Sequence, residues 1–355
     1  MHLQSSISRL TITISLLFVI CRPVSAQLGD RVAEHENGPA AALRYHRLAS
    51  VARDAGRFNE SETFSRRSLQ EWERIHGKEH QDVAAALNNL GEILRTLHRF
   101  AEAESSYRRA LYMFEKVYGP AHPEVAAVLN NMGLLWIQQD NPAKAVPLLR
   151  RAVAIWKSKF GDEDVRTMTG LHNLADASRM GGDFAVAERM HRRVLAWRET
   201  TFGLHSPEVA ASLSSLATTY MDMRNYADAE DLYRRALCLW EESQGPGHLK
   251  TAAALNNLGT LYALQSRYTD AEPLYRRALS IQEQILGPDH AIVGRTLNSY
   301  ASLLMRLNRK AEAKRARDRA QRILTAHART NHLDLTVAAA QLGYVSHDQD
   351  ALIPH

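Results

Sequence analysis

The chain has 355 residues, of which 45% are hydrophobic and 23% charged, a composition that is typical of an ordered, soluble protein. Its formal net charge of +5 is small, and no run of five or more Lys or Arg occurs, which argues against a nucleic-acid-binding protein. The two cysteines, Cys21 and Cys238, are too few for a disulfide framework.

The first 26 residues have the features of a secretory signal peptide. Arg9 precedes an apolar run at 10–20, and the small residues at 24–26 form a cleavage signal. The apolar run is shorter than the roughly 20 residues that a membrane-spanning helix needs. We therefore expect cleavage after Ala26, export to the periplasm or the extracellular space, and no membrane span in the mature chain. An uncleaved anchor is the alternative.

Residues 27–42 form a short N-terminal stub, and from 43 to 328 the sequence repeats every 42 residues without a gap. One series of positions carries leucine, a second carries glycine or alanine four residues later, and a third carries alanine. The leucine series consists of Leu87, Leu129, Leu171, Leu213, Leu255 and Leu297. A period of this length predicts stacked supersecondary units, each burying its apolar face against its neighbours.

The unit at 253–294 shows what one repeat contains. Apolar residues recur at helical spacing from 255 to 262 and again from 271 to 285, and Gly287 with Pro288 ends the second run. Each unit is therefore predicted to be a helix, a short turn, a longer helix and a loop. Small residues such as Gly259 are expected where the two helices cross closely.

The two end units depart from this pattern. The first, at 43–84, carries Ser61, Ser65 and Ser68 where the other units carry mostly Ala, Tyr and Ala, and the second helix of the last, at 295–328, is rich in Lys and Arg. Terminal units must expose one face to water, so we interpret both as caps. Residues 329–355 are predicted to form a short capping helix and a disordered tail.

The repeat resembles the tetratricopeptide repeat in its 42-residue, kinesin-light-chain-like form. The resemblance rests on the pattern Leu-x-x-Leu-Gly/Ala, on Ala103, Tyr107 and Ala110 in the second helix, and on YRRAL at 107–111 with its copies at 233–237 and 275–279. It implies an all-α, right-handed superhelical solenoid of about seven helix-turn-helix units. It also implies that the first helix of each unit lines a concave surface that binds a protein or peptide segment.

In such a solenoid, the position after each leucine of the series would face the bound peptide. We refer to these six positions as the ladder. The ladder consists of Asn88, Asn130, His172, Ser214, Asn256 and Asn298. An asparagine amide both donates and accepts hydrogen bonds, so it suits recognition of an extended backbone. Arg95 and Arg179, two turns further along the same face, are predicted to belong to the same surface. The alternative is that the ladder side chains bond within the array or face water.

Catalytic and metal sites are not expected. Glu92 and Asp176, the sharpest candidates for a carboxylate pair, stand two units apart, roughly 20 Å if helices pack at about 10 Å, whereas paired glycosidase carboxylates lie about 5–10 Å apart. Histidine recurs at one loop position in four units, and Asp164 and Ser206 take that position in two others, which favours helix capping over metal binding. These histidines are His80, His122, His248 and His290. We expect no enzyme activity and no cofactor.

The sequence thus predicts an exported scaffold that binds a protein or peptide segment. Two other functions stay open: a regulatory or sensor subunit of an envelope enzyme complex, and a saccharide- or lipid-binding envelope protein. The latter would need exposed aromatic rings on the first helices, and Tyr220 and Tyr262 are the main ones there, at core-packing positions. Acidic residues along the same face argue against nucleic acid as a partner. The partner's identity and the oligomeric state are not predicted.

Overall fold

The computed structural model describes residues 38–330, so the predicted signal peptide, residues 27–37 of the N-terminal stub and residues 331–355 of the predicted C-terminal segment lie outside the described residues. The described part contains 14 helices and no strand. The helices are α2 (Pro39–Asp54), α3 (Phe58–His76), α4 (Gln81–Thr96), α5 (Phe100–Tyr118), α6 (Pro123–Gln138), α7 (Pro142–Phe160), α8 (Val165–Met180), α9 (Phe184–Phe202), α10 (Pro207–Asp222), α11 (Tyr226–Gln244), α12 (Leu249–Leu264), α13 (Tyr268–Leu286), α14 (Ala291–Arg306) and α15 (Lys310–Thr330).

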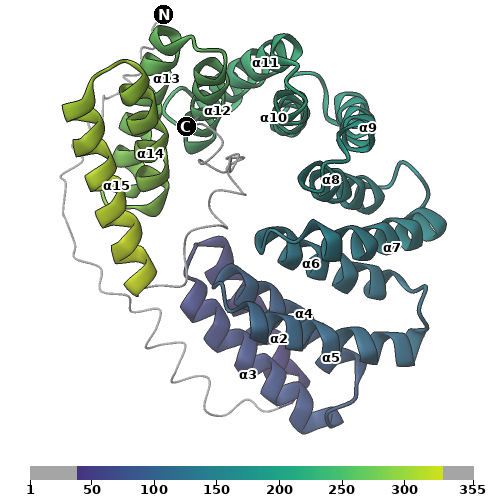
Figure 1. The fold of residues 1–355 in the computed structure, drawn as a ribbon. Coiled ribbons are helices and arrows are strands. Elements are labelled where there is room, and N and C mark those ends of the chain that lie inside the picture. The colour runs from purple at the N-terminus through teal and green to yellow at the C-terminus, as the bar shows by residue number, and fades with distance from the viewer. Residues whose placement is uncertain (1–37, 331–355) are drawn as a thin grey trace, which may run out of the picture.

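These helices form seven pairs that follow the predicted period. The first helix of every pair has 16 residues and the second has 19, except that α15 has 21. Each helix packs mainly on the helices before and after it in the chain, as in a solenoid. Figure 1 shows the pairs following one another along an arc, with the first helices from α4 to α14 on its inner side and the second helices outside. The all-α solenoid of seven helix-turn-helix units is confirmed.

Small residues allow the two helices of a pair to cross closely. A Cβ added to Gly133 would lie 2.4 Å from Leu149 of the partner helix, and one added to Gly91 would lie 2.7 Å from Tyr107. The alanine that recurs every 42 residues in the second helix is fully or almost fully buried in six pairs. These alanines are Ala103, Ala145, Ala187, Ala229, Ala271 and Ala313.

Glycine ends the second helix of six pairs because the backbone there is left-handed, with φ between 77° and 92°. In all six cases the next first helix begins four residues after this glycine. Equal helix lengths and equal turns therefore give every pair the same orientation relative to the pair before it. This regularity is what aligns the ladder positions.

An arginine at the position of the second arginine of YRRAL links five of the outer helices to the outer helix one pair earlier. In five places it forms an ion pair with a glutamate 36 residues before it, at 2.6–3.0 Å, and we call these the outer ion pairs. They are Arg109–Glu73, Arg151–Glu115, Arg235–Glu199, Arg277–Glu241 and Arg319–Glu283. In α9 the equivalent Arg193 pairs instead with Asp162 of the loop before α8, at 2.7 Å. The motif is therefore structural, and each pair contributes up to about 1 kcal/mol.

The serines of the first unit do not form its water-facing side. Ser61 donates to the Ala49 carbonyl at 2.7 Å and Ser68 donates to the Ala42 carbonyl at 2.9 Å, both buried between α2 and α3. The uncovered side is instead the outer side of α2, where Val51 is 59% exposed because α2 is the first of the described helices. The serines thus replace apolar contacts by hydrogen bonds within the pair. In α15, by contrast, Lys and Arg side chains are exposed as expected of a cap.

Candidate ligand-binding surface of the inner helices

All six ladder residues lie on first helices, each of them seven residues after the first residue of its helix. The helices that carry them run along the inner side of the arc in Figure 1. Arg95 lies near the end of α4, and Arg179 lies at the equivalent point of α8. The structure thus places every predicted site residue on the helices that line the inner side.

Part of the ladder is used within the array. The side-chain amide of Asn131 donates to Asn88 Oδ1 at 3.0 Å, and that of Asn173 donates to Asn130 Oδ1 at 2.9 Å. Each bond joins two neighbouring first helices. Ser214 donates to the Ala210 carbonyl of its own helix at 3.0 Å. The side-chain oxygens of Asn88, Asn130 and Ser214 therefore make hydrogen bonds within the array, as the alternative interpretation of the ladder predicts.

Four of the other predicted site residues carry buried polar atoms whose hydrogen bonds are not made. Asn256 is only 6% exposed, and its Oδ1 has no hydrogen-bond partner among the described residues. The same is true of His172 Nδ1, Arg95 Nε and Arg179 Nε. A buried polar atom without a partner costs about 1–3 kcal/mol. Four of the eight predicted site residues therefore have unmet hydrogen-bonding capacity.

The central pair, α8 and α9, contains a cluster of ionisable groups at the ladder. Asp176 lies 3.5 Å from Nε2 of His172 and 3.5 Å from Nε2 of His191, which is 1% exposed. One turn along α8, Arg179 forms an ion pair with Asp222 of α10 at 2.6 Å. The cluster therefore joins the inner face to the interior of the pair.

Sequence reasoning missed His191, although the repeat contained a signal for it. In the next two pairs the same two positions hold hydrogen-bonded partners, Thr218 with Tyr233 at 2.8 Å and Thr260 with Tyr275 at 3.0 Å. Asp176 and His191 take the places of this threonine and tyrosine. Compared with these next two pairs, the exchange of threonine for an acid and of tyrosine for histidine is the sequence signal that marks the central pair.

Burial and mutual attraction determine the charges of this cluster. Burial lowers the pKa of His172 to about 4, against the opposing effect of the Asp176 charge, so the imidazole is neutral near pH 7. Burial alone would raise the pKa of Asp176, but the neighbouring His172 and His191 together hold it well below its usual range. Asp176 is therefore a carboxylate beside a neutral imidazole.

The candidate carboxylate pair has no shared site. Glu92 pairs with Arg53 at 3.3 Å, whereas Asp176 contacts the two histidines of the central pair. The two acids have separate partners on α4 and α8, two helix pairs apart. These separate partners argue against a two-carboxylate active site formed by Glu92 and Asp176.

The recurring loop histidines cap helices, as predicted. In all four, Nδ1 accepts a hydrogen bond at 3.2–3.3 Å from the backbone N–H two residues later, at the start of a first helix. These are His80, His122, His248 and His290. Asp164 and Ser206 make the equivalent caps with side-chain oxygens.

Tyr220 and Tyr262 are buried, and their hydroxyls are bonded to Glu188 at 3.0 Å and to Glu230 at 3.1 Å. Both glutamates belong to the outer helix of the preceding pair. The two rings are thus part of the packing between pairs. They do not provide the exposed stacking surface that saccharide binding on the inner helices would require.

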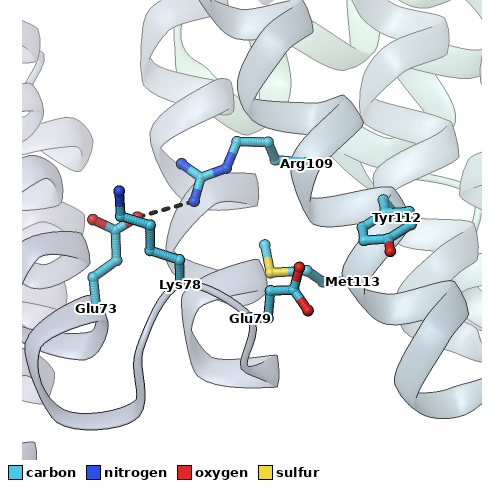
Figure 2. A pocket seen from close by; sticks show the side chains of 6 residues that line it. All are labelled: Glu73, Lys78, Glu79, Arg109, Tyr112 and Met113. Carbon is cyan, nitrogen blue, oxygen red and sulfur yellow. Dashed lines mark hydrogen bonds and ion pairs between the residues drawn. The ribbon is translucent and has the colours of Figure 1, made fainter.

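A hollow lies on the outer side, between α3, the loop before α4, and α5 (Figure 2). Both of its acids are in ion pairs, because Arg109 pairs with Glu73 at 3.0 Å and Lys116 pairs with Glu79 at 2.7 Å. It contains none of the predicted site residues. In the described residues, no helix is both long and apolar enough to cross a membrane.

The tetratricopeptide repeat model matches the chain five times, at residues 40–116, 82–158, 124–200, 208–284 and 251–326. The chain belongs to the tetratricopeptide repeat family. The matches leave out only residues 201–207 between 40 and 326, so they cover almost all of the described helices of this tetratricopeptide repeat protein. No curated protein matches its sequence.

Solved structures share its fold at low sequence identity. A putative kinesin light chain with nearly identical TPR-like repeats from Podosopora anserina is 20% identical, with a TM-score of 0.51, covering 59% of this chain and 99% of that one. BtubC (BKLC) from P. vanneervenii is 21% identical, with a TM-score of 0.50 and coverages of 66% and 92%. The Rap conjugation gene regulator of plasmid pLS20, solved with the Phr* peptide, is 13% identical, with a TM-score of 0.59 and coverages of 90% and 81%.

Proposed function

We propose that this protein is a scaffold that binds a peptide or protein segment along its inner helices, without catalysis and without a cofactor. The observation that carries the proposal is the unmet hydrogen-bonding capacity of Arg95, His172, Arg179 and Asn256 on those helices. An extended segment offers one N–H and one C=O per residue. Small side-chain rotations would turn the buried atoms toward it, and the bonds formed would offset the cost of leaving them unpaired.

The solved neighbours support this class of ligand. One is a Rap protein complexed with competence and sporulation factor, 14% identical with a TM-score of 0.55, and another is NprR in complex with its cognate peptide NprX, 16% identical with a TM-score of 0.55. At these identities the likeness extends to the fold alone. These complexes nevertheless show that other proteins with this fold bind a factor or a peptide.

We infer further that the protein acts outside the cytoplasm. This rests on residues 1–26, whose basic residue, apolar run and small-residue cleavage signal are typical of a secretory signal peptide. The bound segment would then belong to an exported or envelope protein.

The binding surface can be tested before the natural ligand is known. Random peptides displayed on phage are selected against the chain, and the selected peptides are titrated against two variants. Ser214→Trp places a large ring on the inner face at a ladder position whose hydroxyl bonds only its own helix. Ser280→Trp places the same ring on the exposed side of α13 and serves as the matched control.

We expect Ser214→Trp to weaken the selected peptides at least about tenfold, which corresponds to about 1.4 kcal/mol. Ser280→Trp should leave their affinity unchanged. Equal affinities for both variants, or a loss with Ser280→Trp alone, would place peptide binding away from the inner face and contradict the proposal.

A further inference from the structure

Away from the inner face, one group of side chains brings three potential metal ligands together. It consists of His76 at the end of α3, His80 in the following loop and Asp82 in the first turn of α4. Asp82 Oδ2 lies 3.4 Å from His76 Nε2 and 3.4 Å from His80 Nδ1. Among residues 38–330, this is the one group of three His, Cys or acidic residues whose ligand atoms all lie within 4.8 Å of one another.

The repeat accounts for only part of this arrangement. Helix capping explains His80, because the other units use the equivalent residue in the same way. Stacking explains a ring at the position of His76, because the next unit stacks Tyr118 on His122 with centroids 4.2 Å apart. Neither explains an imidazole at this position together with a carboxylate that contacts both rings. The next three units have Tyr118, Phe160 and Phe202 at the position of His76.

The donor set and its spacing suit a transition-metal ion. Two imidazole nitrogens and one carboxylate oxygen are ligands that zinc uses, and His-x3-His is a usual ligand spacing. Bonds of about 2.0–2.2 Å in a tetrahedral site put neighbouring ligand atoms about 3.3–3.5 Å apart, and the two measured separations of 3.4 Å fall in this range.

The site is accessible, and it must adjust to take an ion. Side-chain exposures are 30% for His76, 35% for His80 and 37% for Asp82, so solvent reaches all three. The two rings now stack in nearly parallel planes, 14° apart with centroids at 3.9 Å. Parallel rings do not point their nitrogens at one ion, so His76 must turn out of the stack. His80 Nδ1, which accepts the capping hydrogen bond from the Asp82 N–H, would give up that bond to coordinate the ion.

We propose that His76, His80 and Asp82 bind a divalent transition-metal ion such as Zn²⁺, with water completing its coordination. Nitrogen donors favour this class of ion over Mg²⁺ or Ca²⁺, which prefer oxygen ligands. Since His76 ends α3 and Asp82 begins α4, the ion links the first helix pair to the second. This site is independent of the inner face and of the peptide-binding proposal.

The test is titration of the full chain with ZnCl2 by calorimetry, together with the visible absorption of bound Co²⁺. His76→Tyr introduces the residue that the next unit has, so the ring stack is preserved. His80→Ser keeps the cap of α4, because Ser206 caps α10 from the same position. His122→Ser makes the same exchange of capping residue one unit later, away from the trio, and is the matched control.

We expect one Zn²⁺ site in the wild type that is weakened at least about tenfold by His76→Tyr and by His80→Ser, and that is unchanged by His122→Ser. Circular dichroism and thermal melts without metal should show all three variants folded. Absence of Zn²⁺ binding in the wild type overturns the proposal. So does wild-type affinity in both ligand variants, because the ion would then be held by other histidines.

Discussion

Two ladder asparagines at equivalent positions should behave in opposite ways when each is replaced by alanine. Asn130 Oδ1 accepts a bond from Asn173 at 2.9 Å, so Asn130→Ala leaves that amide without its partner inside the array. The lost bond is worth about 0.5–1.5 kcal/mol, and the half-buried donor adds part of an unpaired group's cost of about 1–3 kcal/mol. We expect the free energy of unfolding to fall by about 1–2 kcal/mol.

Asn256→Ala removes an oxygen that has no partner, so stability should stay the same or rise slightly. Its effect should fall on binding: one lost hydrogen bond of about 0.5–1.5 kcal/mol weakens a selected peptide roughly two- to twelvefold. Asn130→Ala should weaken the same peptide less than about twofold. Urea unfolding and calorimetric titration of both variants measure the two effects. If Asn256→Ala lost stability and kept its affinity, the unmet oxygen would have no role in binding and the reasoning would be wrong.

Three further predictions concern packing, pH and processing. Ala229→Phe should destabilise the array by about 1–3 kcal/mol or more, because Ala229 is fully buried where α10 and α11 cross, and an unchanged melting curve would refute that packing. Lowering the pH from 6.5 to 4 should destabilise the fold by up to about 3 kcal/mol through His172, whose folded pKa of about 4 lies below its ordinary 6.5, so that the unfolded chain takes up the proton first. Urea unfolding at the two pH values should show a smaller loss for His172→Asn. Mass spectrometry of exported protein should find a chain that starts at Gln27, and recovery of Met1 in a membrane pellet would count against cleavage.

The period and the helical spacing of apolar residues were sufficient to predict the fold. Leucine, glycine and alanine recur where the pairs cross, and the same contacts repeat in every unit, so one unit predicts the others. The capping histidines were also predictable, because capping depends only on residues close in sequence. Both predictions rest on local or periodic interactions.

The details of the site depend on side-chain contacts between helices, which the pattern of small and apolar residues does not contain. Asn130 and Asn256 occupy equivalent positions, yet only Asn130 is known to accept a bond from the next helix. Similarly, Asp176 and His191 lie on different helices, and their pairing is visible in sequence only as a joint departure from Thr and Tyr. The serines of the first unit bond across to α2, the other helix of their own pair, and the repeat pattern does not contain this contact because the other units mostly have apolar residues there.

The outer ion pairs make the array tolerant of changes in its own length. In these pairs the arginine meets a glutamate 36 residues before it, so removing one whole 42-residue unit leaves a new arginine at the same distance from an older glutamate. Deleting residues 207–248, for example, brings Arg277 opposite Glu199, which Arg235 contacts at present. The exception is a deletion directly after α7, which carries Lys157 at the glutamate position. Insertion of a copied unit preserves the register in the same way. The length of the arc, and with it the length of segment that it can hold, can therefore change by whole units without redesign of the joints.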